Sequence, residues 1–188
     1  MTGETQEQAQ RQPSPEAEAD AITRDTSVGE ALGRVGIEPC IVGEEDDLMQ
    51  VTEAMAARPG TQTAAVVDKE RRLVGTIPMR LLLAELYLRV APEEFLAGMR
   101  AMEDVEEFGK ISRARTAREL MQPPVWVTMG DSARDAFVKM HEHKLEGLPI
   151  VDKDMRVVGY LDRFQLVRLW LQKHREMRSS AADAEAGV

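Results

Sequence analysis

The sequence predicts an α/β fold made of two pseudo-symmetric units, each running strand, helix, strand, strand, helix. The first observation is a repeat: residues 67–75 (VDKERRLVG) and 151–159 (VDKDMRVVG) align without a gap, with six of nine positions identical. The second is that the same order of elements surrounds both copies. In each copy an apolar segment is followed by a charged stretch, at which the chain is expected to turn, and then by a second apolar segment that ends in Gly. This pattern is typical of a β-hairpin with its charges at the exposed tip.

The segments before each hairpin are also repeated. We expect short helical stubs at residues 28–32 and 117–121, and short strands at 40–42 and 125–127. The two copies therefore stay in register well beyond the hairpins.

A helix is expected between the first and second strand of each unit. In the second unit Ser132 and Asp135 resemble a capping box, and in the first the acidic run 44–47 favours the positive end of a helix dipole. The apolar residues fall at the spacing of one helix face: Ala133, Ala136, Phe137 and Met140 in the second unit, and Leu48, Val51 and Met55 in the first.

A second helix should follow each hairpin. Its predicted apolar face consists of Leu82, Leu83, Leu86 and Tyr87 in the first unit, and of Phe164, Val167 and Trp170 in the second.

The length of the units indicates how they assemble. A unit of about 60 residues buries too little apolar surface to be stable alone, so we expect the two units to stack as one domain pair. The predicted boundaries are a disordered tail at 1–24, a first unit at 25–90, a helical insert at 91–112, a second unit at 113–176 and a disordered tail at 177–188.

The composition excludes several classes of protein. The chain has 188 residues, 43% of them hydrophobic and 30% charged, and a formal net charge of −9. This acidic balance argues against nucleic acid as a partner, and no apolar stretch is long enough to span a membrane. With one cysteine, Cys40, and no apolar signal segment, we expect a cytoplasmic protein without an internal disulfide. The basic run 173–175, with Arg178, is interpreted as the end of the last helix, where cations complement the dipole.

The sequence offers only weak candidates for catalytic or metal-binding residues. His141 and His143 are separated by one residue, so their imidazoles diverge on a helix, whereas zinc-binding helices place His at i and i+4. Neither a G-x-S-x-G motif nor a phosphate-binding loop is present. Cys40 lies in an apolar strand, where a buried, inert thiol is expected. We therefore expect no catalytic residues, no metal site and no enzymatic activity.

The second unit resembles one half of a tandem pair of CBS domains (cystathionine-β-synthase domains). The resemblance depends on three segments, the opening of residues 117–121, the run 148–152 (LPIVD) and the exit 158–161 (VGYL), and on the order of elements. It covers about residues 25–176 apart from the central insert. It implies a regulatory or sensory module that needs no cofactor and binds an adenosine-containing ligand, AMP, ATP or S-adenosylmethionine, between the units.

The resemblance also implies where such a ligand would bind. The family has a Ser or Thr three residues after the Gly of the last strand, and an Asp for the ribose three residues later. Here Gly159 is followed by Asp162 and Gln165 in those positions. Because Asp162 repels phosphate, a nucleoside or S-adenosylmethionine suits the site better than ATP. The expected ligand-binding residues are Val125, Val127, Gly147, Leu148, Pro149, Ile150, Asp162 and Gln165.

The first unit departs further from the family pattern. Gly75 is followed by Pro78 and Leu81, neither of which offers a polar side chain to a ribose or a phosphate. We therefore expect any ligand to bind at the second unit.

An alternative function remains open, a ligand-independent scaffold for dimerisation or for binding an unidentified protein. CBS pairs commonly associate through their helices, and this chain carries many apolar helical residues. A symmetric homodimer is therefore expected, with the apolar side chains Met55, Leu86, Phe137, Met140 and Trp170 available for it.

Overall fold

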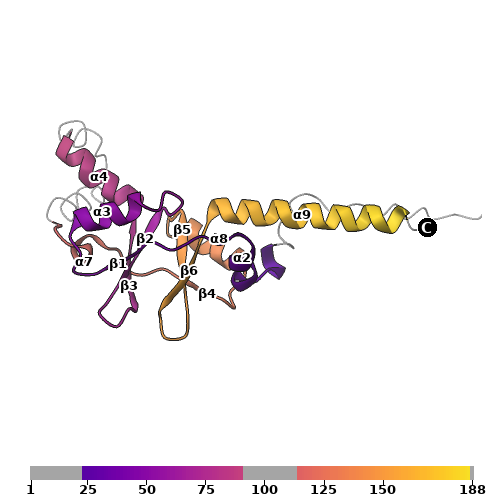
Figure 1. The fold of residues 1–188 in the computed structure, drawn as a ribbon, viewed down its shortest axis with the longest axis horizontal. Helices are drawn as coiled ribbons and strands as arrows, with labels where there is room; N and C mark the ends of the chain where they lie inside the picture. Colours follow the sequence, from indigo (N-terminus) through magenta and orange to yellow (C-terminus); the bar gives the residue numbers. More distant parts are fainter. Residues whose placement is uncertain (1–22, 91–113, 187–188) are drawn as a thin grey trace, which may run out of the picture.

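The computed structural model describes residues 23–90 and 114–186 of the chain. Two three-stranded sheets lie side by side at the centre, and helices gather at the two ends (Figure 1). The predicted α/β fold with two similar units is confirmed. Its elements are α2 (Val28–Val35), β1 (Ile41–Gly43), α3 (Leu48–Ala56), β2 (Thr63–Val67), β3 (Leu73–Pro78), α4 (Met79–Val90), α7 (Ala117–Leu120), β4 (Val127–Thr128), α8 (Ala133–Glu142), β5 (Gly147–Val151), β6 (Val157–Asp162) and α9 (Arg163–Ala186).

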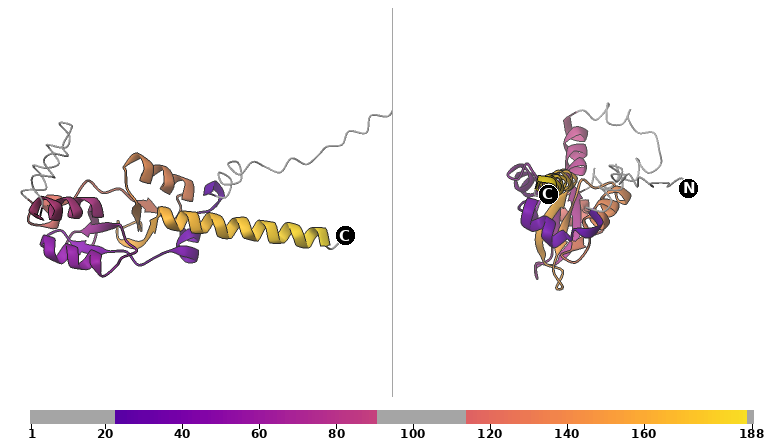
Figure 2. Two further views of the ribbon diagram at one scale, coloured as in Figure 1. Left: turned by 90° about the horizontal axis from the view of Figure 1, so that it is seen from above. Right: turned by 90° about the vertical axis from the view of Figure 1, so that its right-hand side faces the viewer.

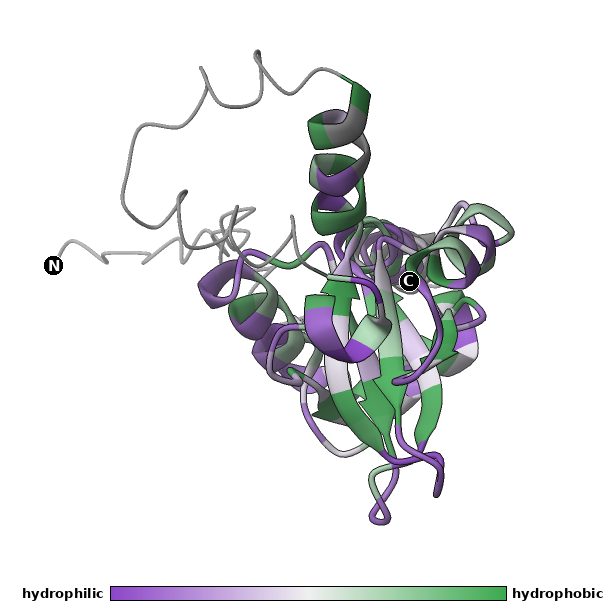
Figure 3. Cartoon of the chain, turned by 90° about the vertical axis from the view of Figure 1, so that its left-hand side faces the viewer, coloured by the Kyte–Doolittle hydropathy of each residue, from purple (hydrophilic) through white to green (hydrophobic). Residues whose placement is uncertain are grey.

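The two sheets have the same topology. In each, the first strand pairs parallel with the second, and the second pairs antiparallel with the third through the predicted hairpin. Each hairpin has a bulge at the corresponding place, after Val66 and after Ile150. Hydrophobic residues fill the strands, whereas the hairpin tips are hydrophilic (Figure 3). The tips also meet, since the Leu73 N–H donates to the Met155 carbonyl at 2.8 Å.

The stub helices are exchanged between the units. Helix α2 precedes the first sheet in the chain, but Val28 and Ala31 are buried in the core of the second unit. Helix α7 precedes the second sheet, but Ala117 and Leu120 are buried in the core of the first. Figure 1 shows the result: α2 lies with α8 and α9 at one end, and α7 lies with α3 and α4 at the other. Each hydrophobic core is therefore built from both halves of the chain.

Backbone hydrogen bonds fix this exchange in a pseudo-symmetric way. The Val28 N–H donates to the Asp131 carbonyl at 2.7 Å, just before α8, and the Ala117 N–H donates to the Asp46 carbonyl at 2.8 Å, just before α3. The helices that follow are capped as the sequence suggests, with a reciprocal Ser132–Asp135 box on α8. Each stub thus closes the end of the opposite unit.

Two predictions about helix α9 are wrong. The tail expected to be disordered from 177 is helical as far as Ala186, and α9 projects well past the rest of the molecule (Figure 2). Its Ala, Arg, Glu and Met residues are good helix formers, and the packed first turns remove the cost of nucleation. The predicted apolar face is wrong as well, because Phe164 and Val167 are 69% and 59% exposed, whereas Leu166 and Leu169 are buried.

The other helices follow the predicted faces more closely. Ala133, Ala136 and Met140 of α8 are fully buried, whereas Phe137 is 51% exposed. On α4, Leu82 is buried, whereas Leu83 and Tyr87 are exposed. The expected insert at 91–112 lies wholly outside the described residues, and so does most of the expected tail at 1–24.

Candidate ligand site between the two units

The sheets face each other along β2 and β5, and this interface is where the family resemblance places a ligand. Ala65 and Leu73 of the first sheet pack there against Val151 of the second. Thr76 lies opposite Ala65 in the register of β2 and β3, so its side chain points to the same face. The interface therefore combines an apolar part near the hairpin tips with polar residues further along the strands.

Asp162 and Gln165 bind each other's backbone at the start of α9. The Gln165 N–H donates to Asp162 Oδ1 at 2.7 Å, and the Asp162 N–H donates to Gln165 Oε1 at 2.8 Å. This is the reciprocal arrangement of a capping box, with Asp162 as the N-cap. Both residues are buried, Asp162 at 8% and Gln165 at 2% exposure. Gln165 Oε1, proposed from the sequence as a ribose contact, is thus already engaged by the helix end.

The charge state of Asp162 reflects two opposing effects. Burial raises the pKa of this carboxyl above its usual range, and the N–H groups of Gln165 and Phe164 offset part of that rise. The carboxylate sits at the positive end of a long helix dipole, which favours its ionised form. A negative charge at this position opposes a second anion such as a phosphate.

The missing side chain of Gly147 accommodates Tyr160 rather than a ligand. A Cβ placed on Gly147 would overlap the Tyr160 hydroxyl oxygen and lie 2.9 Å from Asp162 Cβ. The Tyr160 side chain reaches across the interface, where its hydroxyl accepts a hydrogen bond from the Gln62 N–H of the first unit at 3.2 Å. Burial raises the pKa of this hydroxyl, so it stays protonated at neutral pH. Sequence reasoning missed Tyr160; the signal was a lone Gly in the strand beside it.

Three of the predicted apolar pocket residues belong instead to the core of the second unit. Val127, Leu148 and Ile150 are fully buried in that core, among residues of α2, α8 and α9. The cause is strand alternation, which turns Leu148 and Ile150 to the helical side. Pro149 is buried opposite Tyr160 in the register. Val125 is half-buried and packs against the same core.

The corresponding region of the first unit is closed by apolar residues. Leu81, in the position of Gln165, is 2% exposed and packs in the first core. Thr76 lies in the position of Tyr160, and its hydroxyl is buried without a hydrogen-bond partner among the described residues. Its backbone pairs with Gln122, at the start of the connection that leads to Val125. Thr76 is a second polar group that sequence reasoning missed.

The remaining candidates from the sequence lie elsewhere. Cys40 is fully buried, and burial raises the pKa of its thiol. His141 and His143 are exposed at the end of α8. Within residues 23–90 and 114–186, no group of three or more His, Cys, Asp or Glu residues is arranged to hold a metal ion. None of the described helices is long and apolar enough to cross a bilayer.

Comparison with known proteins finds a family model that matches part of the second unit and solved structures that share the fold of both units. A family model described as "CBS domain" matches residues 117–171. Inosine-5'-monophosphate dehydrogenase from Halobacterium salinarum is 27% identical over 153 residues, which are 80% of this chain. The chain spans 28% of the length of that enzyme.

Solved structures match across both units. A CBS domain-containing protein from Thermotoga maritima has a TM-score of 0.60 and 22% identity, covering 76% of this chain and 92% of its own. CBSX2 from Arabidopsis thaliana, solved with AMP, has a TM-score of 0.57 and 22% identity over 79% of this chain and 98% of its own. The CBS domain pair of protein MJ0100, solved with 5'-methylthioadenosine and S-adenosyl-L-methionine, has a TM-score of 0.56 and 19% identity over 79% and 98%.

Residues 117–171 of the second unit thus match the model of a CBS domain, and the two units together have the fold of solved CBS-domain pairs.

Proposed function

We propose that the chain is a non-catalytic regulatory module that binds an adenosine-containing ligand between its units and responds by changing how they pack. AMP is bound by CBSX2, and S-adenosylmethionine by protein MJ0100, which supports this class of ligand. The proposed contacts are at the start of α9, where Asp162 and Gln165 lie, and on the connection that carries Val125. Core residues Val127, Leu148 and Ile150 support the site from behind.

The observation that carries the proposal is a set of buried polar groups at the interface. Thr76 has a buried hydroxyl without a partner among the described residues, and Asp162 is a buried carboxylate whose neighbours are mainly backbone N–H groups. Buried polar groups without partners are rare in folded proteins and call for an explanation. A ligand with hydroxyl and amine groups would supply the partner that Thr76 lacks and further donors to the Asp162 carboxylate, which the end of α9 already engages.

The charge of Asp162 selects among adenosine-containing ligands. A carboxylate accepts strong hydrogen bonds from hydroxyl groups and attracts a cation, whereas it repels a phosphate. Adenosine and S-adenosylmethionine should therefore bind more tightly than AMP or ATP.

Calorimetric titration of the wild type with adenosine, S-adenosylmethionine, AMP and ATP tests the proposal. The key variant is Asp162→Ser, because Ser also caps a helix while removing the negative charge. It should bind AMP and ATP more tightly than wild type, on the order of tenfold for about 1.4 kcal/mol of lost repulsion. Asp154→Ser, which removes a charge at an exposed hairpin tip, should leave all affinities unchanged. Absence of binding by all four compounds at millimolar concentration would contradict the proposal.

A homodimerisation or partner-binding scaffold is the second candidate, favoured by an apolar groove on the outer face of α3 and α4. The groove has a volume of about 440 Å³ and is lined by Asp47, Leu48, Met49, Thr52, Met55, Ala56, Met79, Leu82, Leu83, Glu85, Ala114 and Arg115. Leu83 of this groove is 57% exposed, and on the matching helices of the second unit Phe137 and Phe164 are 51% and 69% exposed. A second copy of the chain would cover these surfaces.

The residues proposed from the sequence for this interface need revision. Met55 and Met140 are 1% and 0% exposed, so they stabilise the cores and cannot contact a partner. Phe137 stays a candidate. Light scattering should give twice the 21.0 kDa chain mass, and Leu83→Lys with Phe164→Lys should give a folded monomer. A wild-type mass of one chain at high concentration would rule out the homodimer.

A further inference from the structure

The basic run at 173–175 needs a new explanation. The sequence suggests that these residues end the last helix and complement its dipole, but α9 continues to Ala186. The effect of the dipole on side chains fades within the last turn. Lys173 and Arg175 lie several turns before that end, so they have another role.

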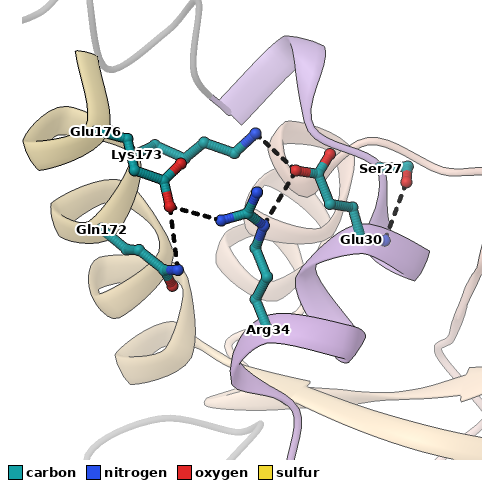
Figure 4. Close-up of polar contacts among 6 residues, drawn as sticks. All are labelled: Ser27, Glu30, Arg34, Gln172, Lys173 and Glu176. Carbon is teal, nitrogen blue, oxygen red and sulfur yellow. Dashed lines mark hydrogen bonds and ion pairs between the residues drawn. The ribbon is translucent and has the colours of Figure 1, made fainter. Parts of the chain in front are cut away.

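Part of this charge is used to hold α2 against α9 (Figure 4). Glu30 of α2 accepts from Lys173 Nζ at 2.6 Å and from Arg34 Nε at 3.2 Å. Arg34 also donates to Glu176 Oε1 at 2.8 Å, and Gln172 donates to the same oxygen at 3.2 Å. Two cations and two carboxylates therefore balance each other within this network.

Two further arginines lie beside the balanced network. A cavity of about 350 Å³ opens between α2 and α9 and is lined by Arg34, Val35, Arg168, Leu171, Gln172, Arg175 and Glu176. Arg168 and Arg175 are seven residues apart, so they lie on one face of α9, about two turns or 10.5 Å along its axis. Among residues 23–90 and 114–186, neither guanidinium forms an ion pair or a side-chain hydrogen bond. The cavity therefore carries a net excess of about two positive charges.

We propose that this cavity is a binding site for a small ligand carrying at least two negative charges on phosphate groups. A guanidinium offers a planar pair of N–H donors that match phosphate oxygens bidentately. The hollow lies within the size range of small-molecule sites. Glu176 also lines it, but its carboxylate already accepts from Arg34 and Gln172. Two arginines facing one hollow stand out on a chain whose net charge is −9.

The site is distinct from the proposed adenosyl site. It lies between α2 and α9, whereas Asp162 and Tyr160 lie where the sheets meet. Helix α2 leads directly into Ile37, which pairs with Tyr160 of β6. An anion held by Arg168 and Arg175 in the hollow beside α2 would stiffen the connection between α9 and the interface of the units.

Titration calorimetry with inorganic pyrophosphate tests the proposal, because this probe lacks the adenosine part. Wild type should bind it, and the double variant Arg168→Gln, Arg175→Gln should bind at least tenfold more weakly at the same ionic strength. Lys69→Gln with Lys153→Gln is the matched control: it removes two charges at the exposed hairpin tips and should change the affinity less than twofold. Adenosine binding should be the same in all three proteins, which separates this site from the adenosyl site.

Two further measurements complete the test. If ATP binds through its phosphates at this cavity, the affinity of the arginine variant for ATP falls by the same factor as its affinity for pyrophosphate. If only free phosphate compounds bind there, its affinity for ATP equals that of wild type. Backbone NMR shifts on wild type with pyrophosphate should cluster on α2 and α9, even if the arginine variant fails to fold. The proposal is overturned if wild type shows no heat at millimolar pyrophosphate, if both double variants weaken equally, or if the shifts cluster elsewhere.

Discussion

The Tyr160 hydroxyl of the second unit accepts a hydrogen bond from the Gln62 backbone N–H of the first, at 3.2 Å. Tyr160→Phe removes this acceptor while keeping the ring over Gly147. We expect the free energy of unfolding to fall by about 1 kcal/mol, the usual net value of one hydrogen bond, measured by urea denaturation. An unchanged midpoint would show that water replaces the hydroxyl at no cost.

The same tyrosine makes stability sensitive to alkaline pH. Burial raises the pKa of the Tyr160 hydroxyl in the folded protein, so the unfolded chain ionises first. Its contribution is complete below the unfolded value of about 10 and is lost as the pH rises above it. Wild type should therefore lose stability faster than Tyr160→Phe above about pH 10, measured by urea denaturation at several pH values.

Gly147 should tolerate no side chain. Gly147→Ala places a methyl group against the Tyr160 hydroxyl, and we expect a loss of about 1–3 kcal/mol, typical of overpacking. Gly130→Ala is the matched control, because nothing lies within 4 Å of its Cβ position. Tyr160→Thr, which copies Thr76 of the first unit, should restore part of the stability of Gly147→Ala in a double-mutant cycle. Additive losses would show that the two positions do not interact.

Asp162 should reduce stability near neutral pH. Burial raises the pKa of Asp162 in the folded state, so folding favours the protonated carboxyl. Its contribution to stability is present below the unfolded pKa of about 3.9 and is lost as the pH rises through the folded pKa. Asp162→Asn keeps a capping side chain without the charge. The stability of this variant relative to wild type should increase from about pH 4 to about pH 7. A constant difference across urea titrations would mean that Asp162 is solvated in the folded state.

The exchange of α2 and α7 predicts that neither unit folds alone. A fragment of residues 113–188 lacks Val28 and Ala31, which complete its core, and should bind hydrophobic dyes and lack dispersed NMR signals. Adding a fragment of residues 23–112 should restore the native spectrum. If the first fragment alone gives a dispersed spectrum, α2 is not needed to complete the core.

The sequence was sufficient to predict the fold because the patterns within each copy of the repeat are local. The hairpins, the helices between the first two strands and the Ser132 capping box depend on residues a few positions apart. It could not reveal the exchange of α2 and α7, since that depends on contacts such as Val28 with Asp131 and Ala117 with Asp46, which are far apart in the chain. It also misplaced the buried face of α9, because Phe164 and Val167 are apolar as well and only packing decides which stripe turns inward.

The candidate site was predicted less well than the fold, for a related reason. The order Gly159, Asp162, Gln165 located the start of α9, but not that the two polar side chains cap it. Strand alternation turned Leu148 and Ile150 away from the interface. Thr76, which does face it, has no sequence pattern of its own, and the only signal for Tyr160 is Gly147 on the neighbouring strand.

The exchanged stubs also set an order for folding during synthesis. Helix α2 emerges from the ribosome long before Val127, Met140 and Leu169 exist to cover its apolar face. At about 5–20 residues per second the delay is on the order of ten seconds. Throughout that time Val28 and Ala31 are open to chaperones or to a neighbouring nascent chain. Helix α9, the last of the described helices to be translated, is thus the one that covers α2.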